Sequence, residues 1–154
     1  MAGLGKLLPL VLFAAVTFSS VTSVSADAPT IEEKNKEIVL SFYEKALNQK
    51  DFAAAEKYFG SRYIQHNPAV PNGPDGLKGL LTLLKEKFPN AHSEIKHIYA
   101  DGDIVILHVH SVRVPGEPGN AIVDIFKLED GKIVEHWDVI QKIPETAANT
   151  NTMF

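Results

Sequence analysis

One carboxylate, Asp124, stands among apolar residues in the segment 122–126, which reads Ile-Val-Asp-Ile-Phe. A carboxylate buried in an apolar strand costs stability unless a partner compensates it. Two candidate partners lie earlier in the chain, where His108 and His110 flank a single valine and therefore point to the same face of a strand. The register between the two segments is open, so either imidazole can lie beside Asp124. An imidazole beside a carboxylate in an apolar pocket is suited to moving a proton to or from carbon.

A tight turn indicates what lies opposite Asp124. The pair Asp130-Gly131 predicts a two-residue hairpin turn, and a regular hairpin with that turn sets Asp124 opposite Trp137. The indole would then be either a wall of a pocket or part of the core. As an alternative to catalysis, Asp124 can be a structural carboxylate that holds the guanidinium of Arg113.

The histidines also allow a metal interpretation, in which His108 and His110 act together with His136 or Asp138. Their spacing resembles the opening of the cupin metal motif. The Glu expected three or four residues after the second histidine is missing, however, because a Val-Pro pair occupies that place. We therefore predict no metal and no other cofactor, and both histidines can equally be hydrogen-bonded core or interface residues.

Three helices are predicted to position these strands. A capping-box pattern at Thr30 begins the first, whose apolar stripe extends to Leu47. The second is expected over 52–59, with Gly60 as its left-handed stop. The third is expected over 74–87, where leucines recur at helical spacing and a Phe-Pro pair follows.

The second half of the chain changes to strand periodicity. Two Asp-Gly turns and a Pro/Gly-rich loop divide it into strands over 93–100, 103–113, 120–129 and 132–143. Three helices followed by a curled, mostly antiparallel meander form an α+β domain. Both faces of the strand over 103–113 are apolar, so we expect one face to line a pocket and the other to be covered in a homodimer.

The N-terminal segment is identified as a secretory signal peptide. Lys6 precedes an apolar run over 7–18 that is too short to span a bilayer, and small residues lead to Ala26. We therefore expect cleavage near Ala26 and a secreted or periplasmic domain over 27–154. Such a domain has no membrane partner after cleavage.

Composition excludes several other classes of protein. The 154 residues include 15 basic and 19 acidic side chains, and the predicted signal contains one of the basic residues and none of the acidic ones. An acidic domain of this kind does not bind nucleic acid non-specifically, so no nucleic-acid partner is expected. The chain has no Cys, which excludes a disulfide scaffold and thiolate-ligated metals.

Three segments resemble the SnoaL-like polyketide cyclases, which belong to the nuclear transport factor 2-like (NTF2-like) superfamily. They are 62–68, which reads Arg-Tyr-Ile-Gln-His-Asn-Pro, 95–110 with its Asp-Gly turn region, and 124–138, the most specific of the three. The likeness extends over nearly all of the expected mature chain. It implies a cone-shaped α+β barrel in which helices and a curled sheet enclose a deep pocket.

The resemblance also implies roles for individual residues. In these cyclases a strand aspartate is the acid/base of a cofactor-free intramolecular aldol condensation, and by its place in the motif this role falls on Asp124. The pocket histidine of the family corresponds to His110. His66 and Trp137 are implied as pocket-lining, substrate-binding residues, and His108 is a further substrate-binding candidate.

We therefore predict a cofactor-independent enzyme that binds a small, mainly apolar carbonyl compound. Asp124 would remove a proton from the carbon α to the carbonyl, and His110, alone or with His108, would stabilise the enolate oxygen. Aldol condensation, isomerisation and dehydration share this first step. The alternative is a secreted module with the same fold that binds a small molecule without turning it over, and in which Asp124 is held in a fixed ion pair.

Overall fold

The computed structural model describes Met1 and residues 28–154. The predicted signal peptide and its cleavage site lie almost entirely outside the described residues, so export stays a prediction. Within the described part of the chain, no helix is long and apolar enough to cross a membrane.

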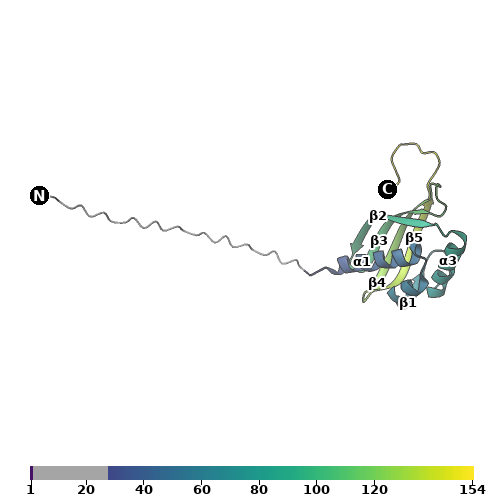
Figure 1. Ribbon diagram of the computed structural model, residues 1–154. Helices are drawn as coiled ribbons and strands as arrows, with labels where there is room; N and C mark the ends of the chain where they lie inside the picture. Colours follow the sequence, from purple (N-terminus) through teal and green to yellow (C-terminus); the bar gives the residue numbers. More distant parts are fainter. Residues whose placement is uncertain (2–27) are drawn as a thin grey trace.

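The helices pack on one face of a curled sheet (Figure 1). The capping box at Thr30 is confirmed: its hydroxyl accepts from the Glu33 backbone N–H at 3.2 Å, and the Glu33 carboxylate accepts from the Thr30 N–H at 2.8 Å. The third helix has the predicted bounds. The helical elements are α1 (Ile31–Tyr43), a π-helical segment η1 (Glu44–Asn48), α2 (Phe52–Ala55), a short 3₁₀ turn η2 (Glu56–Tyr58) and α3 (Pro74–Lys87).

The sheet has five strands, one more than the sequence predicted. The four predicted strands form an antiparallel meander, and a fifth strand pairs in parallel with the last of them at the edge of the sheet. Their order across the sheet is β1-β5-β4-β3-β2. The strands are β1 (Phe59–Gln65), β2 (His92–Asp101), β3 (Ile104–Val112), β4 (Asn120–Glu129) and β5 (Lys132–Lys142).

The end of the second helix was predicted wrongly. The helical turns stop at Tyr58, and Phe59 and Gly60 belong to β1 instead of ending a helix. The glycine is required by a close approach, because a Cβ at Gly60 would lie 2.7 Å from a methyl carbon of Val134 in β5. Gly60 therefore leaves room for the Val134 side chain where β1 lies beside β5.

Val134 forms a β-bulge in β5. Leu128 pairs with Ile133, but the next residue of β4, Lys127, pairs with Glu135, so Val134 is an extra residue in β5. One extra residue shifts the register of everything beyond it by one and exchanges the two faces relative to a regular hairpin. Asp124 consequently lies opposite Asp138 and not, as predicted, opposite Trp137.

The core lies between α1, α3 and the concave face of the sheet. Alternate residues of the strands point into it, and the aromatic ring of Phe42 packs against those of Phe59 and Phe126 with centroids 5.4 and 5.7 Å apart. The core continues into a pocket where the helices separate from the sheet. Its most completely buried side chains are Val39, Leu81, Val105, Leu107, Val109, Phe126 and Ile133.

Candidate functional site

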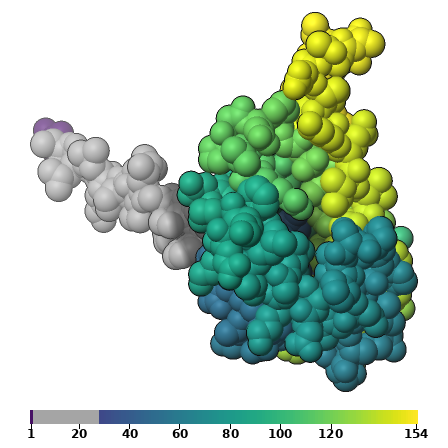
Figure 2. All heavy atoms as spheres, turned by 90° about the vertical axis from the view of Figure 1, so that its right-hand side faces the viewer, coloured from purple at the N-terminus to yellow at the C-terminus, as the bar shows by residue number. Residues whose placement is uncertain are grey.

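A pocket of about 390 Å³ lies between α1 with η1, α3 and the concave face of the sheet. On the face that carries α3, the surface is hollowed between the teal, blue and green atoms of the chain (Figure 2). One side of the pocket is apolar, and the other carries titratable and hydrogen-bonding groups. The apolar side includes Phe42, Leu47, Leu77, Leu80, Leu84 and Ile122.

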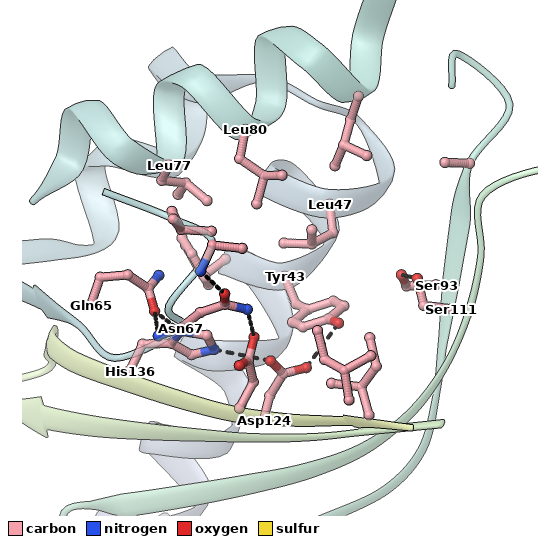
Figure 3. A pocket seen from close by; sticks show the side chains of 18 of the residues that line it. Tyr43, Leu47, Gln65, Asn67, Leu77, Leu80, Ser93, Ser111, Asp124 and His136 are labelled. Carbon is pink, nitrogen blue, oxygen red and sulfur yellow. Dashed lines mark hydrogen bonds and ion pairs between the residues drawn. The ribbon is translucent and has the colours of Figure 1, made fainter. Parts of the chain in front are cut away.

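Asp124 lies in the polar wall of this pocket (Figure 3). Asp124 is only 5% exposed, and both of its carboxylate oxygens have hydrogen-bond partners. The Tyr43 hydroxyl donates to Oδ2 at 3.0 Å, and Nε2 of His136 lies 2.9 Å from Oδ1. The partners of the predicted catalytic carboxylate are therefore a tyrosine and a histidine that the sequence analysis did not place beside it.

The hydrogen bonds of Gln65 determine where the protons of His136 lie. The backbone N–H of Asn67 donates to Gln65 Oε1 at 2.8 Å, so this oxygen is an acceptor. It also lies 2.9 Å from Nδ1 of His136, which must therefore carry a hydrogen. The contact between His136 Nε2 and Asp124 then requires one further proton, held by either the imidazole or the carboxylate. The pair thus shares a single proton inside the pocket wall.

A second carboxylate, Asp138, lies beside this pair on the neighbouring strand. Asn67 Nδ2 donates to Oδ2 of Asp138 at 2.6 Å, and Asn67 Oδ1 accepts from the backbone of Ala69 at 2.8 Å. The chain turns over 67–70, where the backbone N–H of Val70 donates to the carbonyl oxygen of Asn67, and this turn holds the Asn67 amide against Asp138 in the pocket wall. One ligand atom each of Asp124, His136 and Asp138 lie within 4.8 Å of one another, the only such group found in the described chain that could hold a metal ion.

Two tyrosines complete the polar wall. Tyr43 is the last residue of α1, where the helix widens into the π-helical segment, a distortion frequent at functional sites. Burial, and then the charge of Asp124, raise the pKa of Tyr43 well above its ordinary value. Burial and the nearby carboxylates likewise raise the pKa of Tyr63. Both hydroxyls therefore keep their hydrogens at any physiological pH.

The structure places His108 and His110 away from Asp124, so the expectation of an adjacent pair was wrong. Asp124 pairs with Leu107 across β3 and β4, and a strand alternates its side chains, so residues 108 and 110 point to the outer face. Nε2 of His110 lies 2.8 Å from the carbonyl oxygen of Pro118. The ring of His108 packs near that of His97, with centroids 5.8 Å apart.

Trp137 and His66 also lie outside the pocket. The bulge at Val134 turns Trp137 to the outer face, where its ring stacks on that of His66 with centroids 4.8 Å apart. The imidazole of His66 in turn lies 2.8 Å from the carboxylate of Glu135. Neither residue is among those that line the pocket.

The alternative role for Asp124, a structural ion pair with Arg113, is not found either. Arg113 lines the pocket, but in the described chain it forms no ion pair with Asp124. Its guanidinium lies 5.7 Å from the ring centroid of Phe88. Asp124 is thus held by a histidine that can gain or lose a proton, and not by a permanent cation.

The family profile of the SnoaL-like polyketide cyclases matches residues 37–148. The chain belongs to the SnoaL-like polyketide cyclase family. The matched range contains every residue of the polar wall described above. Among curated proteins, a sequence search found no match.

Solved structures show that this family member has the NTF2-like fold. TsrD from Streptomyces laurentii is 18% identical, with 72% of this chain and 91% of that chain covered at a TM-score of 0.60. A protein from Acidithiobacillus ferrooxidans, proposed to be a polyketide cyclase, is 22% identical, with 73% and 91% covered at 0.60. An NTF2-like protein from Cytophaga hutchinsonii is 19% identical, with 70% and 89% covered at 0.58. The predicted α+β, NTF2-like architecture is therefore confirmed.

Proposed function

We propose that this SnoaL-like protein is a cofactor-independent enzyme that transfers a proton at the carbon α to a carbonyl group. The observation that carries the proposal is the single proton shared by Asp124 and His136 in the wall of a mainly apolar pocket. A pair that holds one proton can accept a second proton and later return it, or donate the one that it holds. The apolar side of the pocket suits a small, mainly hydrophobic carbonyl compound.

The surroundings of Asp124 favour acid/base work over a purely structural role. A structural carboxylate is best held by a permanent cation, whereas Asp124 is held by a histidine and a tyrosine hydroxyl. Gln65 fixes the orientation of the histidine, so the pair needs no rearrangement before a reaction. Each positioned acid or base contributes about 10²- to 10⁴-fold in rate.

Aldol cyclisation, isomerisation and dehydration all begin with this proton transfer, and the proposal covers the step they share.

The alternative function is a module with the same fold that binds a small molecule without turning it over. It is favoured by the fact that both oxygens of Asp124 already have partners, which would also describe an inert carboxylate.

The test is hydrogen–deuterium exchange at the α-carbon of 2-tetralone, a bicyclic apolar ketone, in deuterated buffer containing EDTA. We expect wild-type protein to catalyse exchange and Asp124→Asn to slow it by about 10²- to 10⁴-fold. Asn keeps the volume of Asp124 and can still accept a hydrogen bond from His136, so the fold should survive. Thermal melting of the same samples checks this. Wild-type protein that exchanges no faster than buffer, but binds the ketone, would favour the binding module.

A further inference from the structure

We infer that the pocket has a second binding site at the end away from His136, where Arg113 binds a carboxylate group of the ligand. The inference names a class of ligand, an apolar molecule that carries a single carboxylate at one end. Where this ligand is taken as the substrate, the inference rests on the proposed function, whereas the binding itself can be measured without turnover.

The two arginines of the chain are in different situations. Arg62 lies outside the pocket and forms an ion pair with Glu129. Arg113 lines the pocket, and in the described chain its guanidinium forms no ion pair and no hydrogen bond. A guanidinium presents five N–H donors in a fork that matches the geometry of a carboxylate. The donors of Arg113 are therefore available to a ligand in the pocket.

A neighbouring aromatic ring holds the Arg113 guanidinium at the edge of the pocket. Phe88 directly follows the end of α3, and its ring centroid lies 5.7 Å from the guanidinium carbon, within the range of a cation–π contact. Arg113 itself comes directly after the end of β3 and is exposed. The cation is thus fixed between the ends of α3 and β3, where a ligand that enters from solvent can reach it.

The pocket wall next to Arg113 is polar. Ser111, two residues earlier in the chain, lines the pocket together with Ser93, and their hydroxyl oxygens lie 3.0 Å apart in a hydrogen bond. Figure 3 shows both serines on the far side of Tyr43 from His136. Serine hydroxyls can rotate to donate to a carboxylate, so this end of the pocket suits a polar group of the ligand.

The two ends of the pocket carry opposite charges. Among the described residues that line it, the acidic ones are Asp124 and Asp138, which lie together beside His136. Arg113 is the one lining residue in the described chain with a permanent positive charge. A ligand carboxylate is therefore repelled at the first end and attracted at the second, which sets the direction in which a ligand lies.

The strand register separates these two ends. Asp124 pairs with Leu107 of β3, and Arg113 follows Leu107 by six residues. A strand rises about 3.3 Å per residue, so the two ends are up to roughly 20 Å apart along β3 before their side chains extend into the pocket. A ligand whose carboxylate binds Arg113 therefore places its apolar body against the apolar side of the pocket.

The test measures the binding of two probes of nearly equal shape by isothermal titration calorimetry at low salt. 2-Naphthylacetate carries the carboxylate, and 2-naphthylacetamide carries a neutral amide in its place. We expect wild-type protein to bind the carboxylate about tenfold or more tightly, because charge-assisted hydrogen bonds are the stronger ones. Arg113→Gln should bind the two probes alike. Arg113→Lys should keep only part of the preference, since an ammonium group lacks the planar fork.

Arg62→Gln is the matched control, because it removes the other arginine of the chain, which lies outside the pocket. It should keep the full preference for the carboxylate, and thermal melting checks that every variant is folded. Wild-type protein that binds both probes equally, or neither of them, would overturn the inference, as would an Arg113→Gln variant that keeps the preference.

Exchange into 2-tetralone, which has no carboxylate, tests the proposed function separately. Absence of exchange in wild-type protein that still prefers 2-naphthylacetate would overturn the proposed function and leave the carboxylate site standing. Exchange by wild-type protein that shows no preference between the two probes would overturn the carboxylate site alone.

Discussion

The two faces of the sheet carry histidines in opposite situations. On the concave face His136 is 8% exposed, and both of its ring nitrogens have partners, Gln65 and Asp124. On the outer face His97, His108 and His110 are half-buried or exposed. The ring of His108 packs near that of His97, and the rings of His108 and His110 both lie near that of Phe154. The comparison shows that the face, and not the number of histidines in a segment, decides which imidazole can take part in chemistry.

The outer face has the properties of a surface for contact. It exposes large apolar side chains, with Tyr99 at 60%, Val123 at 36% and Val139 at 67% of their full accessibility. Such a surface on a small domain favours association. The homodimer expected through this face stays a prediction, as do the absence of a bound metal and the exported location.

The largest expected difference between the two faces is in stability. His136→Leu removes the partner of Asp124 inside the pocket wall and leaves a buried carboxylate with the Tyr43 hydroxyl alone, so the free energy of unfolding should fall by about 3–5 kcal/mol. His110→Leu, the matched change on the outer face, removes one exposed hydrogen bond and should cost about 1 kcal/mol. Urea unfolding of both variants measures the difference. Equal losses would mean that the two faces are energetically alike.

The tyrosines of the two faces should also differ in how they affect stability at alkaline pH. The pKa values of Tyr43 and Tyr63 are raised in the folded state by burial, so the folded protein holds their protons above pH 10 while the unfolded chain releases them. Their contribution to stability is therefore almost complete below pH 10 and is lost as pH rises further, at a rate that approaches roughly 3 kcal/mol per pH unit for the two groups together once the unfolded chain is fully deprotonated.

Unfolding by urea at several values between pH 9 and 11 would measure this slope. Tyr43→Phe should reduce the slope that is due to the tyrosines to about half, because only Tyr63 then holds a proton in the folded state that the unfolded chain releases. Tyr99→Phe, on the outer face at 60% exposure, should leave the slope as it is in the wild type. A slope that responds equally to both variants would contradict the difference between the faces.

Local signals in the sequence predicted most of the fold. The capping box at Thr30, the leucine spacing of α3 and the Asp130-Gly131 turn each depend on a few neighbouring residues, and each is found where it was expected. The turn expected at Asp101-Gly102 lies one residue later, at Gly102 and Asp103, because Asp101 pairs with Ile104. β1 was missed because its sequence lacks clean alternation and its only strand partner, β5, lies about seventy residues later. A strand that pairs in parallel is not joined to its partner by a short hairpin, so no turn motif in the sequence indicates the pairing.

The site was predicted only in part. The register between β3 and β4 was open in the sequence, so the partner of Asp124 was sought at His108 or His110, and a regular hairpin was assumed between β4 and β5, which sets Trp137 and not His136 on the face of Asp124. The bulge at Val134 brings His136 inward and sends Trp137 outward. The available signal was two consecutive apolar residues, Ile133 and Val134, both buried, in a strand that otherwise alternates.

The smallest of the expected effects tests this bulge directly. Gly60→Ala places a Cβ 2.7 Å from the Val134 methyl carbon, closer than such atoms approach, so the bulge must shift or strain. Overpacking of this kind costs about 1–3 kcal/mol. Val134→Ala removes the clashing methyl at the cost of some buried apolar surface, and it should make Gly60→Ala nearly harmless.

A double-mutant cycle of Gly60→Ala and Val134→Ala measures the coupling by urea unfolding, and exchange into 2-tetralone follows the geometry of the pocket. The double variant should be more stable than the sum of the single changes by about 0.5–3 kcal/mol, because the two side chains compete for one space. Exchange should fall in Gly60→Ala, whose strained bulge moves His136, and recover in the double variant. Additive losses with unchanged exchange would mean that Gly60 does not make room for the bulge, and that the assignment of His136 to the inner face depends on other contacts of β5.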